Sequence, residues 1–178
     1  MTKDQIIAAA DHIFTALAAK CRNVEEGLFF EREPGKWSVA ENLQHLIIST
    51  NTSTLAYSLP KFLVKWIGGR DNPHGATYEE LAARYFAKLD EGAKASGRYV
   101  PEPVEVKYGK DRLLKNWEKA TLKFISALEH NRTEADLDEY FVKHPLLGRI
   151  SLRELGYFTI FHTEHHLRTI EKRLYPES

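Results

Sequence analysis

The chain has 178 residues, with 25 Lys or Arg balanced by 25 Asp or Glu, so its formal net charge is zero. A nucleic-acid-binding protein normally carries a basic excess or stripe, and this chain shows neither. Its single cysteine, Cys21, excludes both an internal disulfide and a cysteine-rich zinc site. No apolar run approaches the roughly 20 residues that a membrane helix needs, and the N-terminus has no apolar signal core. We therefore expect one cytoplasmic domain over residues 1–178.

The apolar residues recur at helical spacing along almost the whole chain. The first helix is predicted over about residues 4–22. A second begins at a capping box, in which Ser38 and Glu41 each accept a hydrogen bond from the other's backbone amide, and it ends before Pro60. His45 is expected to share an apolar seam of this helix, facing a neighbouring helix, with residues 48, 52, 55 and 59.

Four further helices are predicted over about residues 62–67, 77–95, 111–129 and 151–174. Two of them open with capping boxes of their own, Thr77 with Glu80 and Ser151 with Glu154. No segment shows the period of two that is typical of a strand. The fold class predicted is therefore all-α, with four main helices and one or two short extra ones.

Two histidines of the last predicted helix, His162 and His166, are four residues apart. Residues at this spacing lie on one helical face, so both imidazoles can reach one metal ion. His165 falls on another face, which becomes more polar toward the C-terminus. The alternative is that the pair consists of ordinary core or surface histidines, because the chain has eight histidines in total.

A third imidazole must come from another part of the chain. His45 is the best placed, since it lies on a helix among apolar residues. His144, directly before Pro145, and His74, in the irregular stretch after Pro60, are the other candidates.

Three stretches resemble the DinB-like metalloprotein superfamily. Residues 36–46 (KWSVAENLQHL) are similar to its second-helix signature, a Trp-Ser or Trp-Thr helix start followed two turns later by His-Leu. Residues 144–155 and 162–166 are similar to its final segment. The resemblance implies a four-helix bundle with an unusual order of helix directions and a divalent metal, commonly zinc or nickel, at one end.

The resemblance also implies the ligands, one histidine from the second helix and two from the last. Carried over to this chain, they are His45, His162 and His166. The family often has a glutamine three residues after the last ligand, where this chain has Thr169, so a supporting role at that position is in doubt. Members are often homodimers.

Three neutral imidazoles with an open position form a catalytic type of metal site, because structural sites are usually closed by four protein ligands. The superfamily includes transferases of low-molecular-weight thiols and metal-dependent hydrolases. The first hypothesis is thus a transferase that activates a small thiol for attack on an electrophilic small molecule, and the second is a hydrolase using water at the same ligands.

A third hypothesis is a non-catalytic, stress-related protein that binds a ligand or partner through its apolar segment 62–67, which could equally be a dimer interface. For the enzyme, Trp66, Tyr57 and the loop over residues 60–77 are candidates for lining the substrate cleft. Core packing is the more frequent role of such aromatic side chains.

Overall fold

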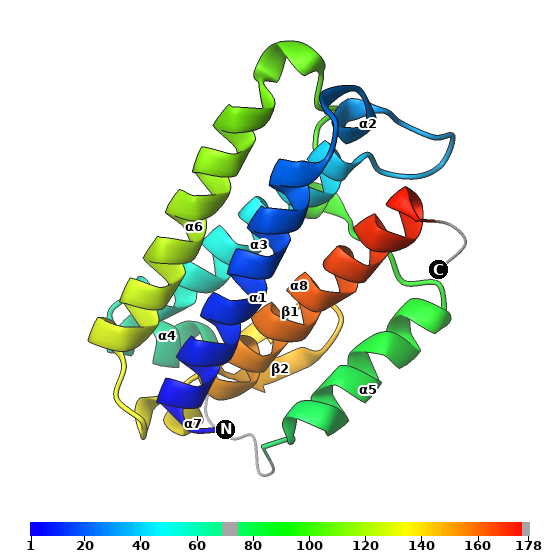
Figure 1. Ribbon diagram of the computed structural model, residues 1–178. Coiled ribbons are helices and arrows are strands. Elements are labelled where there is room, and N and C mark those ends of the chain that lie inside the picture. Colours follow the sequence, from blue (N-terminus) through cyan, green and yellow to red (C-terminus); the bar gives the residue numbers. More distant parts are fainter. Residues whose placement is uncertain (69–74, 176–178) are drawn as a thin grey trace.

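Four long helices lie side by side in the computed structural model, which describes residues 1–68 and 75–175 (Figure 1). They are α1 (Lys3–Asn23), α3 (Val39–Ser58), α6 (Lys110–Asn131) and α8 (Leu152–Leu174). Helices α1 and α3 each pack against both α6 and α8. The all-α bundle predicted from the sequence is confirmed, and each of these helices begins and ends within two residues of its predicted bounds.

Shorter elements surround the bundle. They are α2 (Glu26–Phe30), α4 (Lys61–Gly68), α5 (Tyr78–Asp90), α7 (Asp136–Glu139) and the 3₁₀ turns η1 (Gly97–Tyr99) and η2 (Val106–Tyr108). The segment predicted as a short helix is α4. The helix predicted to run to residue 95 ends at Asp90, because Gly92 adopts a φ of +92°, which suits glycine and breaks the helix.

A two-stranded antiparallel hairpin, β1 (Phe141–His144) and β2 (Gly148–Ser151), precedes α8. The expectation of no strand was wrong here, because strands of four residues are too short to show a period of two. The hairpin packs against α4 at Gly68, where an added Cβ would lie 1.7 Å from the carbonyl oxygen of Phe141. Only glycine allows this approach.

Capping boxes fix the starts of four helices. The three predicted from the sequence, at Ser38, Thr77 and Ser151, are all present, and a fourth joins Thr2 to Gln5 at the start of α1. These caps satisfy amide groups that would otherwise lack partners in the first turn. No helix within the described residues is long and apolar enough to cross a membrane.

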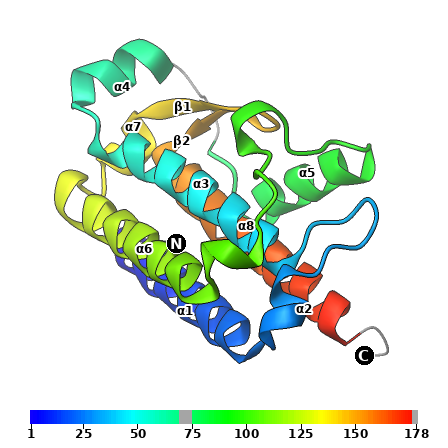
Figure 2. The same ribbon diagram turned by 90° about the horizontal axis from the view of Figure 1, so that it is seen from above.

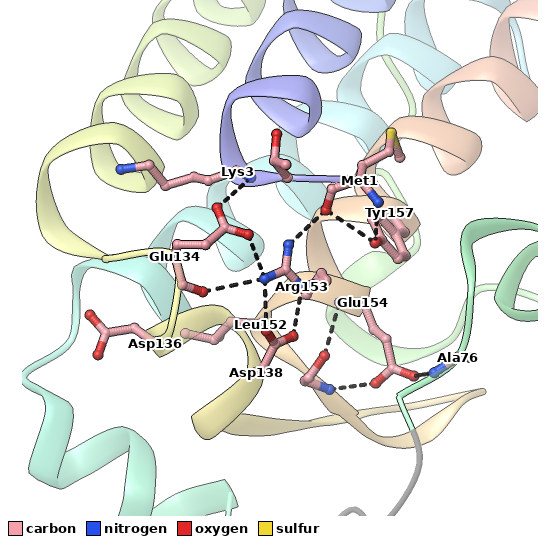
Figure 3. Close-up of polar contacts among 12 residues, drawn as sticks. Met1, Lys3, Ala76, Glu134, Asp136, Asp138, Leu152, Arg153, Glu154 and Tyr157 are labelled. Atoms are coloured by element: carbon pink, nitrogen blue, oxygen red, sulfur yellow. Dashed lines mark hydrogen bonds and ion pairs between the residues drawn. The ribbon is translucent and has the colours of Figure 1, made fainter.

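A charged network joins the N-terminus to α7 and the first turn of α8 (Figure 3). The Arg153 guanidinium donates to Asp138 Oδ1 at 2.6 Å, to Glu134 Oε1 at 2.7 Å and to the Met1 carbonyl at 2.7 Å. Every partner in this network is part of the chain itself, so the network anchors one end of the bundle.

Candidate metal centre

Three histidines from two helices meet inside the bundle. His45 comes from α3, and His162 and His166 come from successive turns of α8. All three are buried, and each offers a ring nitrogen such that the three nitrogens lie within 4.8 Å of one another. The closest pair is His45 Nε2 and His162 Nε2, 3.1 Å apart.

The other histidines considered as ligands, His165, His144 and His74, are not part of this group of three. His165 is half-buried beside this cluster, with its ring against those of Phe86 and His166. His144 lies on β1, and its Nδ1 accepts hydrogen bonds from the backbone amides of Leu146 and Leu147 at 3.2 Å each. His74 lies outside the described residues.

Hydrogen bonds at the outer nitrogens orient two of the rings. His45 Nδ1 lies 2.6 Å from the carbonyl oxygen of Tyr99, and His166 Nδ1 lies 2.7 Å from Asn42 Oδ1. A carbonyl oxygen only accepts, so Nδ1 carries the proton in both rings and Nε2 is left with its lone pair. Such bonds to the outer nitrogen are typical of histidines that bind metals through Nε2.

The amide of Asn42 is itself held in one orientation. Its Nδ2 donates to the carbonyl oxygens of Ser38 at 2.8 Å and Trp37 at 3.4 Å, at the start of α3. The amide oxygen must therefore face His166. The capped first turn of α3 thus determines, through Asn42, which nitrogen of His166 points toward the other two histidines.

The third ring, His162, has a weaker outer partner. Its Nδ1 lies 3.4 Å from the Ser49 hydroxyl, which can donate or accept. If Nδ1 donates to Ser49, His45 and His162 face each other with two lone pairs, a repulsive arrangement that a cation between them would relieve. Two ligands at the usual Zn–N distance of ~2.0–2.1 Å lie roughly 3.4 Å apart in a tetrahedral site. The observed 3.1 Å separation therefore fits a shared metal ion.

Burial keeps the cluster uncharged. It lowers the pKa of His45, and it lowers the pKa of His162 and His166 well below the ordinary value of 6.5. Charge repulsion from neighbouring imidazoles, including that of His165, acts in the same direction on all three. At neutral pH the three rings are thus in the deprotonated form that metal binding requires.

A family model described as the DinB superfamily matches residues 7–170, nearly the whole chain. The chain belongs to the DinB superfamily. Comparisons with curated proteins and with solved structures find no match. Superfamily membership and the buried group of three histidines together fit a metal-binding DinB-like protein.

A cavity of about 1070 Å³ opens beside the histidines of this DinB superfamily member. His45, His162 and His166 all contribute to its wall, which is otherwise mainly apolar and also includes Leu59, Val64, Ile67, Tyr85, Leu146 and Phe158. In Figure 2 the segment between α5 and α6 passes over the region between α3 and α5, and residues 93–96 and 98–100 of that segment line the cavity. The three histidines therefore lie in the wall of a cavity that is large enough for a small molecule.

The two aromatic residues considered for the cleft both lie elsewhere. Tyr57 is fully buried in the core, where its hydroxyl donates to the Leu152 carbonyl at 2.7 Å. Trp66 is 82% exposed on α4 and does not line the cavity. Trp37 takes the role instead, since its ring lies against those of His45 and His166 with centroids 5.0 and 6.2 Å apart.

His45 shares a face of α3 with residues 52, 55 and 59, as expected, because all four line the cavity. The expectation that this face packs against a neighbouring helix was wrong for residues 52, 55 and 59, which are half-buried or exposed. The buried polar neighbours of His45 on α3 are Asn42 and Ser49, three residues before and four after it. That spacing was a readable signal, whereas nothing local points to the Tyr99 carbonyl.

Proposed function

We propose that His45, His162 and His166 hold a divalent metal ion, zinc or nickel, and that the protein is a transferase of low-molecular-weight thiols. The observation that supports this best is the convergence of three imidazoles on one point in the wall of a large cavity. A metal ion held there would leave a position for a guest, because structural sites usually use four protein ligands.

The ligand set determines what the site would do. A divalent ion with three neutral ligands keeps its full charge, and so it would lower the pKa of a thiol from about 8.5 and favour the nucleophilic thiolate. The reaction would form one bond between sulfur and an electrophilic carbon. The thiol proton passes to solvent, and the displaced group leaves with its electron pair.

The thiol must come from outside the chain. Cys21, the only cysteine, is buried in α1, and burial raises the pKa of its thiol to about 12. It therefore stays protonated and unreactive at neutral pH. The cavity provides room for a thiol and for part of an electrophilic small molecule.

The test begins with metal analysis of protein prepared without chelators. A panel of glutathione, bacillithiol, mycothiol and coenzyme A is then assayed against 1-chloro-2,4-dinitrobenzene, with the His162→Ala variant as control. Thiol conjugation that requires both metal and His162 supports the proposal. Ester hydrolysis with the same requirements and no conjugation would favour the hydrolase instead. Protein that takes up neither zinc nor nickel would favour the non-catalytic hypothesis.

We also propose a homodimer. Helix α4 exposes Phe62 and Trp66, with 71% and 82% of their surface accessible, on one apolar face. Apolar faces of this kind frequently mark protein interfaces. Light scattering at increasing protein concentration tests this, with Trp66→Glu as the variant expected to remain monomeric.

A further inference from the structure

The charges that line the cavity are all of one sign. Six Lys or Arg side chains contribute to its wall, but no Asp or Glu does so among the described residues. The six are Lys36, Lys94, Arg98, Lys143, Lys172 and Arg173. In a chain with equal numbers of basic and acidic residues, this is a local departure from the overall balance.

Two of the six already have acidic partners within the chain. Lys36 pairs with Glu33 at 2.8 Å, and Arg173 pairs with Glu33 at 3.2 Å. The other four, Lys94, Arg98, Lys143 and Lys172, have no carboxylate partner within the described part of the chain. They are exposed, so they lie where the cavity meets solvent.

Three of these unpaired cations come from two segments that both line the cavity. Lys94 and Arg98 follow α5, and Lys172 lies in the last turn of α8. Figures 1 and 2 both show the end of α5 and the last turns of α8 on the same side of the molecule. The four exposed cations form a cationic rim, and the rest of the wall is mainly apolar, with Leu59, Val64 and Leu146 among its residues. A cationic rim over an apolar interior is complementary to a molecule with both an anionic group and an apolar body.

We propose that the cavity binds an amphipathic anion, a small molecule with an apolar body and a carboxylate, sulfonate or phosphate group, as a substrate of the metal centre. The role of this anion as a substrate rests on the proposed function, whereas its binding to the cavity does not. The cations attract the anionic group and the apolar wall takes the body, which places the remainder of the molecule beside the three histidines.

The test compares two fluorescent probes with the same aromatic skeleton. 8-Anilinonaphthalene-1-sulfonate carries an anionic group, and N-phenyl-1-naphthylamine lacks it. Metal-free protein is expected to bind the sulfonate at least about tenfold more tightly, with a preference that weakens as salt is added. Equal affinity for the two probes, or binding of neither, would overturn the proposal.

Variants locate the binding site. The double variant Arg98→Glu, Lys172→Glu is expected to lose at least about tenfold in affinity for the sulfonate while keeping its affinity for the neutral probe. The matched control is Lys115→Glu, Lys123→Glu, which changes the same charge on exposed residues of α6 away from the cavity. An equal loss in both double variants would show a general charge effect and contradict the proposal.

A third variant tests the apolar interior. Thr52 lines the cavity from α3, so Thr52→Phe should narrow the cavity and lower the affinity for both probes. Unchanged affinity of both probes in a folded Thr52→Phe protein would place them elsewhere and refute the assignment.

The anionic group could belong to the thiol or to its electrophilic partner, and a competition experiment separates these sources. Displacement of the sulfonate probe by glutathione from zinc-loaded protein assigns the rim to the thiol. Failure to displace it assigns the rim to the partner. Zinc occupancy is measured separately by elemental analysis, so a failure of the metal proposal leaves the probe preference intact and can be told apart from it.

Discussion

Helix α8 carries two polar clusters of opposite character. In its first turn, Arg153 is surrounded by carboxylates, and its hydrogen bonds with Asp138 raise the pKa of its guanidinium. About two and a half and three and a half turns later, His162 and His166 lie among apolar and neutral groups, and burial lowers the pKa of both. One cluster is held in its charged form and the other in its neutral form.

The difference between the clusters lies in what each leaves unsatisfied. Each guanidinium nitrogen of Arg153 donates to an acceptor within the chain (Figure 3). The imidazoles of His45 and His166 have outer acceptors, which leave their Nε2 atoms as acceptors, and ring nitrogens of all three histidines converge inside the bundle. Buried acceptors normally have partners, so this convergence fits a site for a cation. The first cluster stabilises the fold, and the second is arranged for a ligand.

The largest expected effect is the loss of a ligand. Loss of a residue that only hydrogen-bonds to a metal ligand usually weakens metal binding by about 10–100-fold. Loss of the ligand itself should cost more, so we expect His45→Ala, His162→Ala and His166→Ala each to weaken zinc binding by more than about 100-fold. His165→Ala is the matched control, and it should bind zinc like the wild type because its ring is outside the cluster. Calorimetric titration measures the affinities. Loss of zinc in His165→Ala with retention in His162→Ala would reverse the ligand assignment.

Asn42→Ala tests the outer partner of His166. Without its acceptor, His166 no longer favours the tautomer with a free Nε2, and zinc affinity should fall about 10–100-fold. Ser49→Ala removes a longer contact of 3.4 Å and should have a smaller effect. Both affinities come from competition with a chromogenic chelator. Wild-type affinity in folded Asn42→Ala would show that the amide does not orient the ring.

Arg153→Met should affect stability alone. Hydrogen bonds to charged groups contribute ~1.5–3 kcal/mol when buried, and the carboxylates here are partly exposed, so we expect a loss of about 2 kcal/mol in unfolding free energy. This corresponds to a melting temperature lower by about 4–8 °C. Arg22→Met, which breaks an exposed pair with Glu118, should cost less than about 1 kcal/mol. A reduced zinc affinity in Arg153→Met would contradict the separation of the two clusters.

A further effect, which develops only below pH 6.5, is in the pH dependence of metal-free protein. Burial lowers the pKa of His144 from 6.5 to about 4, so between these values the unfolded chain binds a proton that the folded chain does not. Stability must therefore fall as the pH decreases from 6.5 to about 4, by at most about 1.4 kcal/mol per pH unit for this group. His144→Asn keeps an acceptor for the two backbone amides and removes the titrating group. The urea concentration at which this variant is half unfolded should therefore fall less steeply as the pH decreases. Parallel curves for the two proteins would refute this contribution.

Much of the bundle could be predicted from local sequence. Periodic apolar residues, together with capping boxes for α3 and α8, placed the long helices within two residues, because both signals depend on neighbours within one or two turns. The hairpin before α8 was missed because its pairing joins two strands too short to show a pattern. The early end of α5 depends on a glycine with positive φ, which the helical pattern alone does not reveal.

For the candidate site, the sequence by itself determined that His162 and His166 share a face of α8, since a spacing of four residues fixes this within one helix. His45 is 117 residues from His162 in the sequence, and only the packing of α3 against α8 brings the two side chains together. The same packing decided which nitrogens face inward, because their partners Asn42 and Tyr99 lie on other elements, and it left the cationic cavity beside them. Short-range spacing is encoded in a few residues, whereas convergence depends on the whole core.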